Sequence, residues 1–303
     1  MTARLTRQPG GAARLRALLD SGQTIVAPGA FDPLAARLVE EAGFPAVYMT
    51  GFGTSAALIG RPDVGLLTMT EMAGNAGRIA ACVDIPVIAD ADTGYGNPLN
   101  VIRTVGAYEA AGVAGIHIED QVAPKKCGHM AGKLVIPAEE MAQKVRAAVE
   151  ARAQPEFVII ARTDARAVEG LERALDRGRM YRDAGADALF IEAVLTEQEA
   201  EEAIRAFPDM PLLFNWAEGG RTPPISLDRL TELGYRIVIF PISTLLAATA
   251  AMRRVLREIA QAGTPAAAMS ELPAFGEFLD FIGLPEVREA EQRYATKDEH
   301  GGF

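Results

Sequence analysis

Residues 86–119, which read PVIADADTGYGNPLNVIRTVGAYEAAGVAGIHIE, contain the pattern that decides the fold. A short apolar run at 86–90 is followed by an amphipathic segment at 100–112 and a second apolar run at 115–119. Continuous apolar strands are buried on both faces, which requires parallel strands joined by helical crossovers. The stretch therefore predicts a strand, a helix and a parallel strand.

The same pattern recurs along the chain and predicts eight strands. The expected strands are 24–27, 45–50, 86–90, 115–119, 157–161, 188–192, 212–215 and 236–240, and the expected helices are 32–43, 68–83, 100–112, 138–151, 174–185, 197–207 and 227–234. Eight alternating units without a break in composition predict an α/β fold, a closed (β/α)8 TIM-type barrel. We expect a single domain over 1–303, in which 265–303 form an extra C-terminal helical segment.

The composition excludes several classes of protein. A formal charge of -10 disfavours a sequence-independent nucleic-acid binder, because such proteins neutralise phosphates with Lys and Arg. Two cysteines do not suggest a disulfide framework. The N-terminal stretch MTARLTRQPGG lacks the apolar segment of a signal peptide, and no apolar run is long enough for a membrane span. We therefore expect a cytoplasmic protein.

Two aspartates stand at and just beyond the end of the third predicted strand. In a barrel of this type, the residues at these strand ends carry the chemistry. Side chains two residues apart in a strand face the same way, so Asp90 and Asp92 are expected to point together into the barrel mouth. Mg²⁺ commonly binds one or two carboxylates together with waters and substrate oxygens, and Glu119 could complete such a site directly or through water. In the alternative interpretation, one aspartate caps the next helix and the other pairs with a lysine.

A cysteine stands between cations and a histidine in KKCGH, residues 125–129. Thiols are usually buried as small hydrophobes, so this setting favours a reactive group. Cys127 could be a nucleophile with His129 as its base, or an acid that protonates a metal-stabilised enolate. A zinc site is disfavoured, because no second pair of soft ligands exists, and an ordinary surface turn is the remaining alternative. His117 lies in an apolar run and is expected to be a hydrogen-bonded core residue.

A positive group is also needed to bind an anionic substrate. Arg162 follows the fifth predicted strand, and a guanidinium can hold a carboxylate at two points. Its alternative role is to bridge Asp164 or Glu192 across the barrel. Further donors to the same substrate are expected from Thr50, the amides around Gly51 and Gly53, Asn215 and Ser243.

From Val26 to Phe281 the chain resembles the isocitrate lyase and phosphoenolpyruvate mutase superfamily. The motifs that carry the resemblance are KKCGH, ADADTGYG, HIEDQ, ARTDA, NWAEGG and FPIS, in the expected order. KKCGH is similar to the lyase and phosphonomutase branches, which use this cysteine motif. The resemblance implies a magnesium-dependent barrel that makes or breaks bonds next to an enolate, and leaves open whether Mn²⁺ can serve.

The resemblance also implies roles for individual residues. It places Asp90 and Asp92 at the metal, with Glu119 in their outer shell, and makes Cys127 the proton donor. Tyr48 becomes the candidate base, and Lys125 and Lys126 lie with Gly128 on a loop that closes over the substrate. The implied substrate contacts are Thr50, Gly51, Asp63, Lys125, Gly128, Arg162, Glu192, Asn215 and Ser243.

Members of this superfamily form homotetramers in which a C-terminal helix is swapped between neighbours, so the resemblance implies a dimer of helix-swapped dimers. The sequence of the tail is consistent with this, because it carries Phe275, Phe278 and Phe281. The alternative is that the tail covers the bottom of its own barrel.

The motifs FIEA and NWAEGG resemble the dimethylmalate lyase, petal-death-type and phosphonomutase branches more than the 2-methylisocitrate lyases. The leading hypothesis is an oxo-acid lyase that cleaves a 2-alkylmalate or a 2-methylisocitrate-like substrate, a dicarboxylate or tricarboxylate, to a 2-oxo acid such as pyruvate. The alternatives are a carboxyphosphonoenolpyruvate phosphonomutase and a non-catalytic barrel that binds a dicarboxylate.

Overall fold

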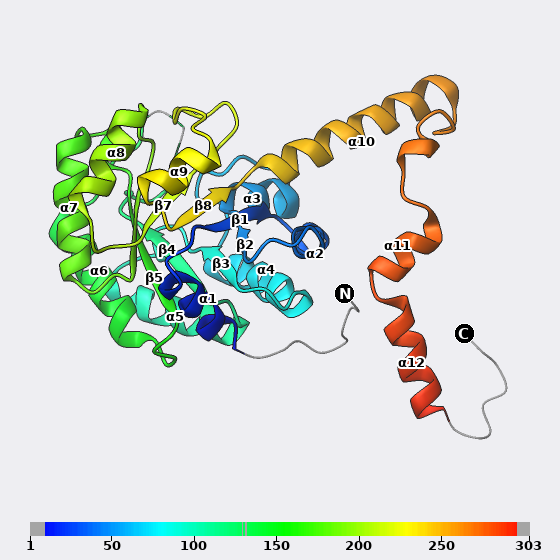
Figure 1. Ribbon diagram of the computed structural model, residues 1–303, viewed down its shortest axis with the longest axis horizontal. Coiled ribbons are helices and arrows are strands. Elements are labelled where there is room, and N and C mark those ends of the chain that lie inside the picture. The colour runs from blue at the N-terminus through cyan, green and yellow to red at the C-terminus, as the bar shows by residue number, and fades with distance from the viewer. Residues whose placement is uncertain (1–9, 129, 131, 296–303) are drawn as a thin grey trace. The chain divides into compact units, whose positions relative to one another are not determined.

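Eight parallel strands close into a barrel in the order β1 to β8 in the computed structural model, which describes residues 10–128, 130 and 132–295 (Figure 1). The strands are β1 (Ile25–Ala30), β2 (Val47–Met49), β3 (Val87–Asp90), β4 (Gly115–Glu119), β5 (Val158–Thr163), β6 (Ala188–Ile191), β7 (Leu212–Asn215) and β8 (Ile237–Phe240). The barrel closes where β1 pairs in parallel with β8. The predicted (β/α)8 fold is therefore confirmed.

Helices surround the strands and connect them. They are α2 (Pro33–Glu41), α3 (Gly51–Ile59), α4 (Met69–Cys82), α5 (Pro98–Ala111), α6 (Ala138–Ala151), α7 (Leu171–Asp183), α8 (Glu197–Ala206) and α9 (Leu227–Leu233). Helix α10 (Ser243–Ala262) follows β8, the last strand, in the chain. A short 3-10 helix, Ala165–Ala167, precedes α7.

The ends of α5 show how the sequence sets these bounds. The Asn97 side chain accepts hydrogen bonds from the backbone of Leu99 and Asn100, and Pro98 occupies the first turn. Gly112 ends the helix with a φ of 82°, a left-handed conformation that favours glycine. The cap of this helix is thus Asn97, and neither Asp90 nor Asp92 serves as its cap.

Alternating side chains of the strands build two apolar layers. Along β3, Ile88 belongs to a cluster inside the barrel, whereas Val87 and Ala89 belong to the larger cluster between the strands and the helices. Burial on both faces explains why the strands read as continuous apolar runs. The packed interior leaves the ends of the strands as the place for a functional site.

One helix that the sequence analysis did not predict, α1 (Gly11–Asp20), packs on the barrel interior. Leu15 and Leu19 lie in the same buried cluster as Ile25 and Val158, the first residues of β1 and β5. The helix therefore covers the barrel where its strands begin and leaves the opposite end for the loops that follow the strands.

The chain divides into two compact units, whose described parts span 10–246 and 247–295. The second unit contains most of α10, a 3-10 helix at Met269–Glu271, α11 (Phe275–Phe281) and α12 (Leu284–Tyr294). The expectation of one domain with a tail from residue 265 stays a prediction. Among the described residues, none of the helices is both long enough and apolar enough to span a membrane.

Candidate active site

A cavity of about 230 Å³ lies at the ends of the barrel strands, entirely within the first compact unit. Residues at or just beyond the carboxyl ends of β2, β3, β5, β6, β7 and β8 converge on it, because these ends of parallel strands share one end of a barrel. The predicted site residues that line the cavity are Tyr48, Thr50, Asp63, Asp90, Lys125, Cys127, Gly128, Arg162, Glu192 and Asn215.

Four other predicted residues lie next to the cavity and do not line it. Gly51 packs against the carboxylate of Asp90, where a Cβ atom would collide with the Asp90 side chain. Ser243 donates a hydrogen bond to Glu218, which does line the cavity. Asp92 and Glu119 are buried behind the lining residues, and His129 lies outside the described residues.

Thr50 has a structural contact at the end of β2. Its hydroxyl accepts a hydrogen bond from the Gly53 amide at 3.2 Å and so caps α3. The Gly53 amide thus already donates a hydrogen bond within the protein, although the sequence analysis proposed it as an anion contact. A role of Thr50 in substrate binding stays a prediction.

A buried lysine ammonium sits among acidic side chains at the cavity. Lys125 Nζ lies 2.6 Å from Asp63 Oδ1 and 2.7 Å from Asp92 Oδ1. The Asp90 carboxylate is close by and accepts a hydrogen bond from the Asp92 amide at 2.8 Å. Burial raises the pKa of Asp92 to about 6, although the Lys125 ammonium opposes this shift. The pairing of one aspartate with a lysine, which the sequence left open, is therefore present.

The acidic cluster, which consists of Asp63, Asp90, Asp92 and Glu119, suits a hard divalent cation in charge and in ligand type. Asp63, Asp90, Asp92 and Glu119 are all at most 8% exposed, and Glu119 Oε1 has no hydrogen-bond partner among the described residues. Carboxylate oxygens are the ligands that Mg²⁺ prefers. In the described part of the chain, no three Asp, Glu, His or Cys side chains already surround one point. Mg²⁺ does not require this, because it commonly binds one or two carboxylates and keeps several waters.

Tyr48 and His117 form a buried pair beside Asp90. The Tyr48 hydroxyl lies 2.7 Å from His117 Nε2, and His117 Nε2 lies 3.5 Å from Asp90 Oδ1. Burial raises the pKa of Tyr48 well above its ordinary value and lowers the pKa of His117 to about 4. Both groups are therefore neutral near pH 7, and in the Nδ1-protonated tautomer the imidazole Nε2 accepts a hydrogen bond from the phenol. The prediction of His117 as a hydrogen-bonded core residue is confirmed.

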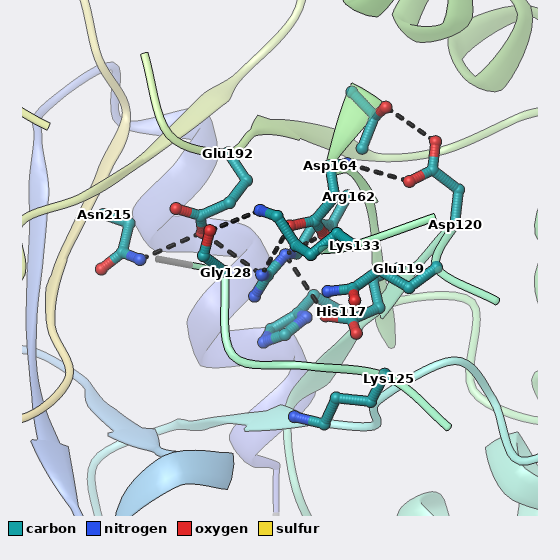
Figure 2. A network of polar contacts seen from close by, with 12 residues as sticks. His117, Glu119, Asp120, Lys125, Gly128, Lys133, Arg162, Asp164, Glu192 and Asn215 are labelled. Atoms are coloured by element: carbon teal, nitrogen blue, oxygen red, sulfur yellow. Dashed lines mark hydrogen bonds and ion pairs between the residues drawn. The ribbon is translucent and has the colours of Figure 1, made fainter. Parts of the chain in front are cut away.

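Arg162 connects three carboxylates around the cavity (Figure 2). Its Nε lies 3.0 Å from Asp164 Oδ2 and 3.3 Å from Glu119 Oε2, and its Nη2 lies 3.5 Å from Glu192 Oε2. The bridging role that the sequence left open is thus present. Because Arg162 also lines the cavity, the bridges hold its guanidinium in a fixed position for an anionic ligand.

The thiol loop, defined as the described residues 121–128, 130 and 132–136, carries Cys127 to the cavity. The Cys127 amide donates to the Asp63 carbonyl at 3.1 Å. At the base of the loop, the Gln121 side chain donates to the Lys126 carbonyl at 2.8 Å and accepts from the Lys126 amide at 2.9 Å. The cysteine therefore faces the same cavity as Asp90 and Arg162, as a proton donor to a bound substrate would require.

Sequence reasoning assigned no role to nine further residues that line the cavity, all of them apolar or glycine except Glu218. The additional lining residues are Phe52, Met130, Ala217, Glu218, Gly219, Gly220, Ile239, Pro241 and Ile242. Six of them lie within the quoted motifs NWAEGG and FPIS, so a search of every residue beside each strand end could have found them. The apolar ones have no such signal of their own, because they resemble core residues.

Comparison with known proteins gives a consistent result over most of the chain. The family model described as phosphoenolpyruvate phosphomutase matches residues 15–260. The 2,3-dimethylmalate lyase of Eubacterium barkeri is 49% identical over 285 residues, which cover 94% of this chain and 98% of the relative. A 2-methylisocitrate lyase of Aeropyrum pernix is 45% identical over 285 residues, which cover 94% and 91% of the two chains.

Solved structures agree with the sequence comparison. A crystal structure of 2,3-dimethylmalate lyase, described as a PEP mutase/isocitrate lyase superfamily member, aligns with a TM-score of 0.91 and 40% identity, covering 98% of this chain and 99% of that one. A phosphonopyruvate hydrolase in complex with oxalate and Mg²⁺ aligns with a TM-score of 0.85 and 35% identity, covering 94% and 99%.

Proposed function

The chain belongs to the PEP mutase/isocitrate lyase superfamily and is a carbon–carbon lyase, and we propose that it cleaves a 2-alkylmalate, with 2,3-dimethylmalate as the best candidate. The observation that carries this proposal is that the Cys127 thiol lines one cavity with the guanidinium of Arg162 and the carboxylate of Asp90. An acid, an anion-binding group and a metal-binding acid thus face the same space.

The lining of the cavity favours a dicarboxylate with apolar substituents over a tricarboxylate. Among the described residues that line it, the cationic side chains are Lys125 and Arg162, and both already contact buried carboxylates. With one substrate carboxylate beside Mg²⁺ and one on Arg162, a third would lack a free cationic partner, because Lys125 is already paired with Asp63 and Asp92, and burying an unpaired charge is costly. Phe52, Ile239 and Ile242 offer an apolar wall that suits methyl groups.

Asp90 and Asp92 would hold Mg²⁺, with Glu119 reaching its outer shell through water. When bound, Mg²⁺ supplies a Lewis acid for the C2 hydroxyl and the neighbouring carboxylate of the substrate. The superfamily member with oxalate and Mg²⁺ supports this assignment.

The residues of the chain then carry the proton transfers. Tyr48 is the candidate base for the C2 hydroxyl proton; it would act as the phenolate, the form that the charges of Arg162 and Lys125 favour against burial. The C2–C3 bond breaks, its electron pair stays on C3, and C2 becomes the carbonyl of pyruvate. Arg162 orients a substrate carboxylate through a paired hydrogen bond.

Cys127 completes the reaction by donating the thiol proton to C3. With 2,3-dimethylmalate as substrate, the second product is propionate, because C3 carries one methyl group and one carboxylate. Water has to be excluded from the carbanionic centre before Cys127 reacts, and the thiol loop, which lines the cavity through Lys125, Cys127, Gly128 and Met130, would serve this purpose.

We further propose a homotetramer built from helix-swapped dimers. The described helices α10, α11 and α12 bury none of their own residues, and the exposed fractions of Phe275 and Leu256 are 78% and 63%. Apolar surface of this extent suits packing on another copy of the chain. Light scattering after gel filtration is expected to give four times the chain mass, and a monomer at micromolar concentration would contradict the proposal.

A coupled pyruvate assay tests the proposed function. The purified protein is incubated with Mg²⁺ and malates that differ at C2 and C3, and lactate dehydrogenase reports pyruvate. We expect 2,3-dimethylmalate to exceed 2-methylisocitrate in kcat/KM by at least about 100-fold, because the tricarboxylate would bury an unpaired charge. Removal of the metal with EDTA should abolish pyruvate release, and added Mg²⁺ should restore it.

Absence of pyruvate from every malate in the presence of Mg²⁺ would overturn the lyase assignment. Phosphorus NMR on carboxyphosphonoenolpyruvate then distinguishes the alternative, because a phosphonomutase produces a new carbon–phosphorus signal and a lyase does not.

A further inference from the structure

Lys133 is a buried lysine that the proposed mechanism does not use. Its side chain is 2% exposed, and its Nζ lies 2.6 Å from Asp164 Oδ1. The same ammonium donates to the backbone carbonyl of Gly128, as Figure 2 shows. Lysine is almost never fully buried unless it is paired. The cost of burying this charge is thus offset by two contacts, one on the barrel and one on the thiol loop.

The barrel contact is rigid. Asp164 directly follows β5, its amide donates to Asp120 Oδ1 at 2.9 Å, and its Oδ2 accepts from Arg162 Nε at 3.0 Å. Burial opposes the ionisation of Asp164, but Arg162 and Lys133 lower its pKa to about 2. Asp164 is therefore a charged and immobile anchor for the Lys133 ammonium.

The loop contact lies at the residue next to the thiol. Gly128 packs closely against Arg162 and Glu192, two of the predicted substrate-binding residues. A Cβ atom on Gly128 would lie 2.5 Å from Arg162 Nη2 and 2.7 Å from Glu192 Cδ. Any movement of the Gly128 carbonyl away from Lys133 would also move Cys127 relative to the cavity. Lys133 itself is not among the described residues that line the cavity, so the role proposed for it needs no direct contact with the substrate.

We propose that Lys133 is a positioning residue that latches the thiol loop to Asp164 and thereby holds Cys127 over the cavity. Its effect on catalysis rests on the proposed lyase function, whereas its effect on the loop does not. Without the ammonium, the Gly128 carbonyl loses its link to the barrel, and the loop spends more time open.

Access to the Cys127 thiol tests the latch without any substrate. The Lys133→Met variant keeps an unbranched apolar stem and removes the ammonium. Lys126→Met is the matched control, because Lys126 lies in the same loop and donates to the Gly132 carbonyl at 2.8 Å, a contact within the loop. Iodoacetamide and a bulky maleimide are each reacted with the protein, and the labelled peptides are quantified by mass spectrometry.

The ratio of the maleimide rate to the iodoacetamide rate reports the access to the thiol, because the fraction of thiolate cancels. We expect Lys133→Met to raise this ratio at Cys127 by about 10-fold or more, since a charge-assisted hydrogen bond is lost, and Lys126→Met to change it less than about two-fold. In the lyase assay, Lys133→Met should lower kcat by a similar factor.

Cys82 provides the measure of general destabilisation. It lies in α4, and burial raises the pKa of its thiol to about 11. If Lys133→Met raised the labelling of Cys82 as much as that of Cys127, or left Cys127 labelling unchanged in a folded protein, the latch would be refuted. If Lys133→Met raised the ratio at Cys127 alone, and the wild-type protein cleaved no malate, the result would support the latch and reject the lyase function.

Discussion

Replacing Cys127 with serine is expected to lower turnover of 2,3-dimethylmalate by at least about 100-fold, the typical contribution of a positioned general acid. Serine fills nearly the same space and still lines the cavity, but a hydroxyl is a much weaker acid than a thiol. Steady-state pyruvate release and Mg²⁺ binding by calorimetry are measured on the same preparation.

Mg²⁺ affinity should stay within about two-fold in this variant, because the thiol belongs to the loop and not to the metal-binding acids. Cys82→Ser is the matched control, since that thiol lies in α4 and hydrogen-bonds to the Ile79 carbonyl, away from the cavity lining. Unchanged turnover in Cys127→Ser would remove the assigned proton donor.

Replacing Asp92 with asparagine is expected to weaken Mg²⁺ binding by at least about 10-fold and to lower kcat/KM by a larger factor. Asparagine keeps the size of the side chain and removes its negative charge, while Lys125 retains its contact with Asp63. Calorimetry with Mg²⁺, and electron paramagnetic resonance with Mn²⁺ as a probe, measure the affinity without relying on activity.

Asp20→Asn provides the control for this measurement. Asp20 is an exposed carboxylate at the last residue of α1, so its loss changes the net charge equally without touching the acidic cluster. Equal Mg²⁺ affinity in the wild-type protein and in Asp92→Asn would contradict the assignment of the metal-binding residues.

The fold was predictable because the strands are short apolar runs, and most of them end at a polar residue or directly before one. The predicted strand 86–90 begins one residue before β3, Val87–Asp90, and ends at the same residue. The predicted strand 115–119 coincides with β4. Helix α3 was not predicted, since its sequence GFGTSAALI opens with two glycines and lacks a clear amphipathic pattern. Helix α1 was also missed, although Leu15 and Leu19 have helical spacing, because the predicted barrel already had eight complete units.

Most of the candidate site was predictable for a geometric reason. Asp90, Arg162 and Glu192 lie at or just beyond strand ends, and a closed parallel barrel brings those ends together. Lys133 was not predictable in this way. Its contact with Asp164 spans 31 residues and depends on the path of the thiol loop, and local sequence patterns do not specify that path.

The most direct test of the central claim is the label that the carboxylate product acquires in D₂O. In the presence of Mg²⁺, 2,3-dimethylmalate should yield pyruvate and propionate with one deuterium at C2 of propionate, on a single face, because one fixed thiol delivers the proton. Chiral derivatisation followed by NMR identifies that face. Propionate labelled equally on both faces, or with no deuterium at C2, would contradict protonation of the enolate by Cys127.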